Sequence, residues 1–324
     1  MKFIDVTEQQ ELVFNQTPTP TITNDECLIK VHALGVNRAD LLQRAGKYPA
    51  PPGESPILGL EVCGEITKLG DDVPGFGLGD KVLGLVSGGG YSEYVKIKAS
   101  HMISLPEQLN YSQGAAIAEV YLTAFQSLFS IANVQPKEQV LIHAGASGVG
   151  TAAIQLCKAI GAEVTVTVSS EKKAKACKAL GADNIINYKN EDFVAWKKQH
   201  LKAGFNVILD VVGGDYLSRN IDVAALDSKI VMLAMLGGRF CEQVDVAKML
   251  LKRVNIHATT LRSRSDSYKS KLVADFNAKF SQALADDSIK PVIEQEIDWS
   301  EADQAHQLMS QNKNIGKYIL TINH

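Results

Sequence analysis

The chain has 324 residues, of which 45% are hydrophobic and 21% are charged, and its formal net charge is −3 at pH 7. This length predicts two domains, and the composition is typical of a soluble globular protein. The small negative charge argues against a nucleic acid or an anionic membrane as the main partner. There is no run of about 18 apolar residues and no basic-then-apolar start, so we expect a cytoplasmic protein.

Residues 1 to about 118 show the pattern of a strand-rich domain. Residues 27–34 and 62–69 alternate like half-buried strands, and Gly and Pro occur densely between Gly46 and Gly90. Many short strands with turn signals and few helices predict a compact, barrel-like β domain. A segment rich in Ala and Leu, residues 114–132, then predicts a helix.

From Gln139 onward, strand patterns alternate with helix patterns. We predict strands at 140–143, 163–168, 184–187, 207–211 and 229–233, with a sixth candidate at 255–260. We predict helices at 151–160, 171–180, 190–202, 216–226 and 243–252. Such alternation implies right-handed crossovers and a parallel, doubly wound sheet, which is an α/β fold.

The remaining tail predicts a helix at 267–287, an extended segment at 289–297, a helix at 300–311 and a strand at 317–322. This tail can return to complete the first domain. We therefore divide the chain into residues 1–122, 123–262 and 263–324, of which the first and the last form one domain.

A turn of very small residues connects the first predicted strand of the alternating region to its helix. Val140 to Ile142 form an apolar run, Ala144 to Gly150 offer almost no side chain, and the helix that follows stops at Gly161. Unpaired backbone N–H groups around such a turn suit a pyrophosphate, because the helix dipole is positive there. An ordinary tight turn remains the alternative, since G-x-G-x-x-G is not met literally.

The residues at the end of the second strand determine whether a Rossmann domain binds NAD or NADP. An acidic residue there binds the ribose 2′-hydroxyl of NAD. This chain has Ser169 and Ser170 there, with Lys173 about one helical turn further on, and all three can bind a 2′-phosphate. The negative charge of Glu171 is unfavourable beside a 2′-phosphate, although this side chain can point outward as a first-turn helix carboxylate. The motif favours NADPH over NADH, and a solvated helix face bearing Lys172 and Lys173 is the alternative.

These motifs resemble those of the medium-chain dehydrogenase/reductase superfamily. Within it, the chain is most similar to the zinc-free NADPH quinone oxidoreductases related to zeta-crystallin, in particular their stress-inducible subgroup. The matching motifs are Val36-Asn-Arg-Ala-Asp-Leu-Leu-Gln-Arg, Leu58-Gly-Leu-Glu-Val-Cys-Gly, Gly89-Gly-Tyr-Ser-Glu-Tyr, His143-Ala-Gly-Ala-Ser-Gly-Val-Gly, Leu261-Arg-Ser-Arg and Asn312-Lys-Asn-Ile-Gly-Lys. The resemblance implies a GroES-like β-barrel domain with an inserted Rossmann domain, and a homodimer.

The resemblance also implies a set of cofactor-binding residues. The pyrophosphate would lie on Gly145, Ala146, Ser147, Gly148, Val149 and Gly150, and the 2′-phosphate on Ser169, Ser170 and Lys173. Tyr188 would border the adenosine end. The nicotinamide half would lie along Thr123, Met235, Leu236, Ala258, Thr259 and Thr260, with Asn314 reaching back from the C-terminal segment. Ser147 departs from the family's Ala-x-x-Gly-x-x-Gly, which leaves the turn geometry open.

Zinc ligands of the related alcohol dehydrogenases are missing. Those enzymes carry Gly-His-Glu where this chain has Gly59, Leu60 and Glu61, and a cysteine near the position of Asn37. Leu60 offers no lone pair, and Cys63 has no histidine at a usable spacing. The five cysteines are scattered without a Cys-x-x-Cys, which favours reduced thiols. We expect no metal.

A quinone can be reduced without a metal, because it is already electrophilic. By resemblance, Asn37 and Tyr48 line the substrate side, where Asn37 can hydrogen-bond an oxygen and Tyr48 can stack on a ring or donate its hydroxyl. Arg38 is better explained by a structural pair with Asp40 or Glu61. The sequence thus predicts an NADPH-dependent quinone oxidoreductase acting on a small molecule. The alternatives are an NADPH-dependent reductase of activated C=C bonds and a nucleotide-binding protein without catalysis.

Overall fold

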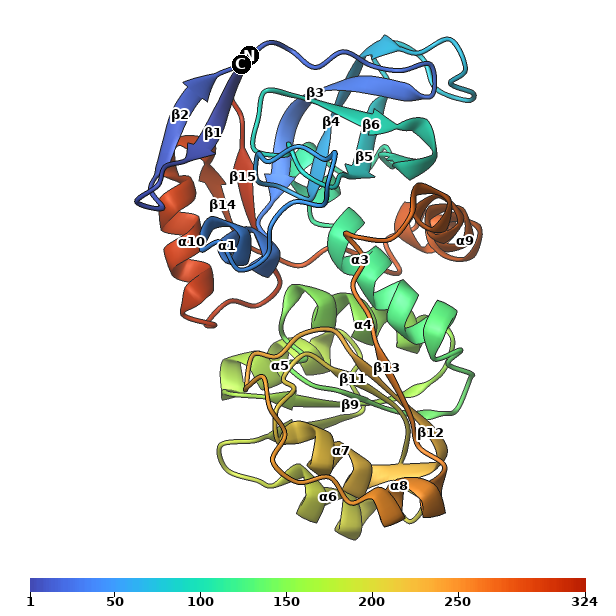
Figure 1. Cartoon of the computed structure of the whole chain (residues 1–324). Coiled ribbons are helices and arrows are strands. Elements are labelled where there is room, and N and C mark those ends of the chain that lie inside the picture. The colour runs from blue at the N-terminus through green and yellow to red at the C-terminus, as the bar shows by residue number, and fades with distance from the viewer. The chain divides into compact units, whose positions relative to one another are not determined.

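Two units divide the chain in the computed structural model, which describes residues 1–324. Unit 1 comprises Met1–Leu122 and Leu261–His324, and unit 2 comprises Thr123–Thr260. Blue segments from the start of the chain and red segments from its end lie together in unit 1 (Figure 1). Unit 1 is therefore assembled from two stretches of sequence with unit 2 inserted between them.

Unit 1 is built on a seven-stranded sheet with the order β14-β15-β3-β4-β5-β7, in which β6 also pairs with β3. The strands from the first stretch are β3 (Glu26–Gly35), β4 (Glu61–Leu69), β5 (Lys81–Leu85), β6 (Tyr94–Lys98) and β7 (Met102–Ser104). The strands from the second stretch are β14 (Ile293–Asp298) and β15 (Lys317–Thr321). A separate hairpin pairs β1 (Lys2–Val6) with β2 (Leu12–Gln16).

Strand β15 joins the two stretches of unit 1, because it lies between β14 and β3. It runs parallel to β14 and antiparallel to β3, with Leu320 opposite Leu34. Both leucines are fully buried, in a core that also contains Ile29, Val31, Val62 and Ile66. The helices of unit 1 are α1 (Arg38–Arg44), η1 (Ala99–His101), α2 (Tyr111–Gly114), α9 (Asp266–Ala285), η3 (Trp299–Glu301) and α10 (Ala302–Ser310).

Unit 2 contains a six-stranded sheet with the order β10-β9-β8-β11-β12-β13, and every pair in it is parallel. The strands are β8 (Gln139–Ile142), β9 (Glu163–Val168), β10 (Asn184–Asn187), β11 (Phe205–Asp210), β12 (Ala224–Met232) and β13 (Asn255–Ala258). Numbered within the unit, this order is 3-2-1-4-5-6, that of a Rossmann dinucleotide-binding fold. The predicted α/β fold class is confirmed.

The helices of unit 2 alternate with these strands, as the sequence predicts. They are α4 (Gly148–Ala159), α5 (Glu171–Ala179), α6 (Phe193–His200), α7 (Tyr216–Val223) and α8 (Val246–Lys252). Helix α4 ends before Gly161, whose φ of 77° is favourable for glycine but strained for other residues. Strand β8 is paired on both sides, and its residues Val140, Leu141 and Ile142 are all buried.

The predicted helix at 114–132 is divided into three segments. They are α2, α3 (Ala118–Phe125) and the π-helix η2 (Gln126–Ile131). Residues Tyr111–Ile131 are together long and apolar enough to cross a membrane, but this stretch is mostly buried inside the protein. Core helices of soluble proteins share these properties, so the stretch does not indicate a membrane protein.

Candidate functional site

The turn between β8 and α4 is tight and nearly free of side chains. Ala144 has a positive φ of 53°, and the N–H of Gly145 donates to the carbonyl of Thr167 at 3.0 Å. Ser147 is the N-cap of α4, since its hydroxyl oxygen accepts from the N–H of Gly150 at 3.1 Å. The N–H groups of the first helical residues, Gly148 and Val149, precede the first intrahelical bonds. They are available to an anion at the positive end of the helix dipole.

Two glycines in this turn are required by close packing. A Cβ on Gly145 would lie 2.6 Å from the Cβ of Val166, and one on Gly150 would lie 2.5 Å from the carbonyl oxygen of Ala144. Contacts this short do not occur between real atoms, so a side chain at either position would push α4 away from the sheet. Ser147 thus caps α4, while the glycines on either side of it allow α4 to pack closely against the sheet.

A buried polar network supports the turn from behind. His143 directly follows β8, and its Nε2 lies 2.8 Å from Oδ1 of Asn220 while its Nδ1 lies 3.1 Å from the hydroxyl of Thr167. Asn220 in turn donates to Asp210 at 3.0 Å. Because Asn220 Oδ1 can only accept, His143 carries its proton on Nε2. Burial lowers the pKa of His143, with Asp210 opposing, so the ring is a neutral structural element.

The end of β9 brings the predicted 2′-phosphate residues together. Ser170 is the N-cap of α5, and its hydroxyl oxygen accepts from the N–H of Lys173 at 3.4 Å. The hydroxyl hydrogen of Ser170 is still available to a ligand, because capping uses only the oxygen. Tyr188 follows the neighbouring strand β10, and its N–H donates to Val168 at 3.1 Å. Ser169, Ser170 and Tyr188 therefore lie at the same edge of the sheet.

The ends of β11, β12 and β13 carry the residues predicted to lie along the nicotinamide half. Met235 and Leu236 follow β12 and are 62% and 55% exposed, and the N–H of Leu236 donates to Val211. Ala258 is the last residue of β13, and the N–H of Thr259 donates to Met232 at 3.0 Å. These residues lie at the carboxyl ends of the parallel strands, where Rossmann folds bind their ligands.

Two predicted cofactor residues remain. Thr123 lies in α3, three residues before Gln126, whose side chain donates to the carbonyl of Thr260 at 3.4 Å. Asn314 belongs to unit 1, where its side chain donates to the carbonyl of Gly316 at 2.6 Å.

Asn37 lies in a buried ion-pair network of unit 1. The ammonium of Lys317 is 2.7 Å from Oε1 of Glu61 and donates to Oδ1 of Asn37 at 2.6 Å. The amide nitrogen of Asn37 donates to Glu61 at 3.0 Å and to Gly35 at 3.3 Å. Both amide hydrogens are thus used within the chain. A hydrogen bond from Asn37 to a substrate, which stays a prediction, would have to replace one of them.

Carboxyl groups concentrate around this network. Asp40 is fully buried and accepts from the N–H of Asn37 at 2.7 Å, and burial raises its pKa to about 6. Glu119 contributes its backbone N–H to Glu61 at 2.8 Å. Burial and then the charge of Glu61 raise the pKa of the Glu119 carboxyl to about 8. Lys317 forms its ion pair with Glu61, and Asp40 and Glu119 have no such ion pair of their own.

The pairing expected for Arg38 is wrong. Its guanidinium donates to the carbonyl of Met309 at 2.9 Å and to the side chain of Asn312, not to Asp40 or Glu61. The sequence could not show this, because Met309 lies in α10 and Asn312 just after it, both more than 270 positions away. The structural role expected for Arg38 holds, with different partners.

Tyr48 lies in the loop after α1 and contacts a residue that sequence reasoning missed. The guanidinium of Arg262 lies over the ring of Tyr48, with Cζ 5.6 Å from the ring centroid. Arg262 also donates through Nε to the carbonyl of Ser87 at 2.7 Å, and Lys269 donates to the hydroxyl of Ser87 at 2.7 Å. The motif Leu261-Arg-Ser-Arg was visible in the sequence, but its proximity to Tyr48 was not.

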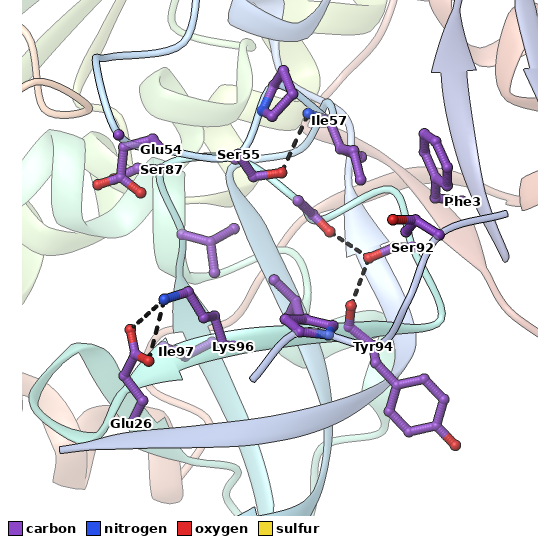
Figure 2. A pocket seen from close by; sticks show the side chains of 18 of the residues that line it. Phe3, Glu26, Glu54, Ser55, Ile57, Ser87, Ser92, Tyr94, Lys96 and Ile97 are labelled. Carbon is purple, nitrogen blue, oxygen red and sulfur yellow. Dashed lines mark hydrogen bonds and ion pairs between the residues drawn. The ribbon is translucent and has the colours of Figure 1, made fainter. Parts of the chain in front are cut away.

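Unit 1 also contains a cavity of about 750 Å³, with Phe3, Glu54, Ser87, Tyr94 and Lys96 among its lining residues. Figure 2 shows two polar pairs within the lining, since Lys96 binds Glu26 and the hydroxyl of Ser92 lies 2.7 Å from the carbonyl oxygen of Tyr94, whereas the carboxylate of Glu54 is drawn without a partner. The chain also contains no group of three or more His, Cys, Asp or Glu side chains that could hold a metal ion.

Comparison with known proteins agrees with this geometry. Residues 23–107 match the alcohol dehydrogenase GroES-like domain, and residues 148–277 match the zinc-binding dehydrogenase family. The chain is 30% identical to mouse quinone oxidoreductase over 309 residues, which cover 94% of this chain and 91% of that protein. The chain therefore belongs to the medium-chain dehydrogenase/reductase superfamily and is an oxidoreductase with a nicotinamide cofactor site.

Three further proteins that are similar to this chain carry three different names. The zebrafish synaptic vesicle membrane protein VAT-1 homolog is 27% identical over 93% of this chain, which spans 65% of that protein's length. The structure of Escherichia coli quinone oxidoreductase complexed with NADPH superposes with a TM-score of 0.86 at 26% identity, covering 99% of each chain. The CurK enoyl reductase superposes with a TM-score of 0.87 at 25% identity, also over 99% of each chain.

Proposed function

We propose that this protein is an NADPH-dependent quinone oxidoreductase that acts without a metal ion. The observation that carries the choice of cofactor is the end of β9, where Ser169 and Ser170 stand in place of the acidic residue that binds NAD. The relatedness to mouse and E. coli quinone oxidoreductases supports the choice of acceptor.

The residues of unit 2 fit NADPH in a consistent order along the sheet edge. The turn Gly145–Gly150 takes the pyrophosphate, with the N–H groups of Gly148 and Val149 donating. Ser169, Ser170 and Lys173 bind the 2′-phosphate, and Tyr188 borders the adenosine. The residues of unit 2 along the nicotinamide half are Thr123, Met235, Leu236, Ala258, Thr259 and Thr260. When bound, NADPH supplies a hydride from its C4 atom.

The chain's task toward the acceptor is to hold it, exclude water and stabilise negative charge on its oxygen. Tyr48 offers a ring face for stacking and a hydroxyl for donation. Asn37 holds Lys317 and Glu61 in place and, like Tyr48, lines the substrate side. No metal takes part in this proposal, because Leu60 replaces the histidine that zinc-dependent relatives use as a ligand.

Steady-state assays with 1,2- and 1,4-quinones test the proposal. We expect NADPH oxidation that depends on the quinone, exceeds the rate with NADH and persists after dialysis against a chelator. Absence of NADPH oxidation with every quinone would refute the quinone reductase assignment. Stoichiometric zinc in the purified, active protein would refute the metal-free part alone.

Reduction of an activated C=C bond is the second candidate, favoured by the likeness to the CurK enoyl reductase. The same hydride geometry serves enals, enones and enoyl thioesters, so a substrate panel separates the two. A nucleotide-binding protein without catalysis is the third candidate. Tight NADPH binding with no turnover on any acceptor would identify it.

We also propose a cytoplasmic homodimer whose only partner of note is a small-molecule substrate. The dimer is an analogy to the family, in which sheet edges commonly pair. Light scattering of the purified protein tests it, since a single species at 35.1 kDa would show a monomer.

A further inference from the structure

Arg262 occupies an unusual position in unit 1. The residue is only 5% exposed, and two of its three guanidinium nitrogens are used within the chain. Nε donates to Ser87 at 2.7 Å, and Nη1 donates weakly to the carbonyl of Tyr48 at 3.5 Å. Nη2 is buried and has no hydrogen-bond partner. The arginine is thus held in place by two backbone carbonyls while its third nitrogen is left to donate elsewhere.

This unpaired nitrogen differs in kind from the other buried polar atoms without partners. Those belong to histidine, glutamine, asparagine and serine side chains, which are neutral or can become neutral. A guanidinium keeps its charge in proteins, so a buried N–H of Arg262 without a partner carries a larger penalty than a neutral donor does. Native structures rarely retain such a group without a specific reason, and contact with a ligand is one such reason.

The surroundings of Arg262 indicate which ligand would satisfy it. The guanidinium lies against the ring of Tyr48, which fixes the guanidinium plane beside an aromatic surface. Lys269, 3% exposed and bonded to Ser87, adds a second cation on the same side. An aromatic ring beside positively charged N–H donors suits a planar molecule that carries a carbonyl oxygen.

We propose that Arg262 binds the carbonyl oxygen of the electron acceptor through Nη2, with the acceptor's planar part packed beside Tyr48. The proposal rests on the proposed function and adds the residue that recognises the acceptor. Reduction of a quinone takes a hydride from NADPH and a proton from solvent, and yields hydroquinone and NADP⁺. Negative charge develops on the oxygen as the hydride arrives, so Arg262 stabilises the transition state more than the bound acceptor. Enals and enones present the same oxygen.

Arg262→Gln and Arg262→Lys test the role of the guanidinium. With 1,4-naphthoquinone or, if that is not reduced, trans-2-hexenal, we expect Arg262→Gln to lower kcat/KM by about 10- to 150-fold, as for one hydrogen bond to a charged donor. Arg262→Lys keeps the positive charge but lacks the planar set of guanidinium N–H donors, so its kcat/KM lies between those of Arg262→Gln and the wild type. The dissociation constant for NADPH changes less than about twofold, because Arg262 acts on the acceptor. Arg253→Gln, which breaks an exposed pair with Asp227, is the matched control and leaves kcat/KM unchanged.

A titration with 1,4-naphthoquinone in the absence of NADPH separates this proposal from the proposed function, since no turnover occurs. Weaker quinone binding by folded Arg262→Gln supports the subsite even if the wild type proves inactive as a quinone reductase. Equal quinone affinity and equal kcat/KM in the wild type and both variants overturn it. Failure of the wild type to bind quinone or enal also overturns it. If Arg262→Gln does not fold, Arg262→Lys decides by the same measurements.

Discussion

We propose that single side chains at the end of β9 determine which nicotinamide cofactor the protein prefers. Lys173 lies in the first turn of α5, one turn from Ser169 and Ser170. We predict that Lys173→Glu weakens NADPH binding by about tenfold or more, because it replaces attraction to the 2′-phosphate by repulsion. NADH lacks that phosphate, so its affinity changes little.

Fluorescence titrations with both cofactors measure this difference. Lys172→Glu, on the exposed neighbouring position, is the control for a general change of charge. Equal losses for NADPH and NADH in Lys173→Glu would show that Lys173 does not bind the 2′-phosphate.

His306 on α10 determines part of the response of stability to acid. Burial, and then the charge of Arg44, lower the pKa of His306 to about 4, and its Nε2 lies 3.0 Å from the hydroxyl of Tyr91. Between pH 6.5 and 4 the unfolded chain takes up this proton and the folded chain does not, so stability falls as the pH falls. The full effect amounts to about 3 kcal/mol.

We therefore predict that His306→Gln flattens the loss of stability across this range. Urea unfolding at several pH values from 7 to 4.5 measures it. Asp40 and Glu119, whose raised pKa values act in the opposite direction, are present in both proteins and cancel in the comparison. Parallel pH profiles for wild type and variant would contradict the assignment.

At the scale of elements, Lys317 attaches β15 to the start of α1. Its ammonium binds Glu61 on β4 together with Asn37 and the carbonyl of Val36, and both charged groups are almost fully buried. We predict that Lys317→Met lowers the free energy of unfolding by about 3–5 kcal/mol, because it leaves Glu61 buried without its partner.

Denaturant unfolding of Lys317→Met and of the exposed control Lys313→Met measures this contribution. A double variant, Lys317→Met with Glu61→Gln, recovers part of the loss, because it removes the unpaired charge. A loss no larger than that of Lys313→Met would show that the pair contributes little.

Sequence reasoning was most accurate for elements whose type and bounds are determined by their own residues. The strands at 163–168 and 184–187 agree with β9 and β10 to the residue, since β-branched and apolar runs there are bounded by clear turn and cap residues. The helix at 114–132 was less accurate, because its division into α2, α3 and η2 does not follow from apolar spacing. The hairpin β1–β2 was not predicted, since Leu12–Gln16 is largely exposed and shows little periodicity.

The candidate site shows the same limit. The turn at Gly145–Gly150 and the Ser169–Ser170 motif are local, so the sequence alone could propose them as cofactor-binding residues, which stays a prediction. Arg262 and Lys317 act through partners on distant stretches, Ser87 and Tyr48 for the first and Glu61 and Asn37 for the second. Only the fold brings these together, so their contributions could not be read from the motifs that contain them.

At the scale of the whole molecule, the two units differ in how much of the chain each requires. All pairings of the unit 2 sheet lie within residues 123–260, whereas the unit 1 sheet needs β14 and β15 from beyond that stretch. We predict that a fragment of residues 123–260 folds by itself, while a chain ending at residue 260 has a folded unit 2 and an unfolded unit 1.

Circular dichroism and the dispersion of amide signals in NMR spectra test both shortened chains. A fragment 123–260 without dispersed signals would contradict the independence of unit 2. Native-like signals from residues 1–122 in the shortened chain would show that β15 is dispensable.

The position of β15 between β14 and β3 also constrains how the protein emerges from the ribosome. Translation delivers Glu26–Gly35 early, and β6 soon pairs with Glu26–Lys30, but the neighbour of Ala33–Gly35 on the same edge is made only after the inserted Rossmann unit is complete. At typical elongation rates of about 5–20 residues per second, the carboxyl end of the nascent β3 waits for on the order of ten seconds or more with its edge open. An uncovered strand edge attracts other strands, so this interval is when chaperone protection matters most for the protein.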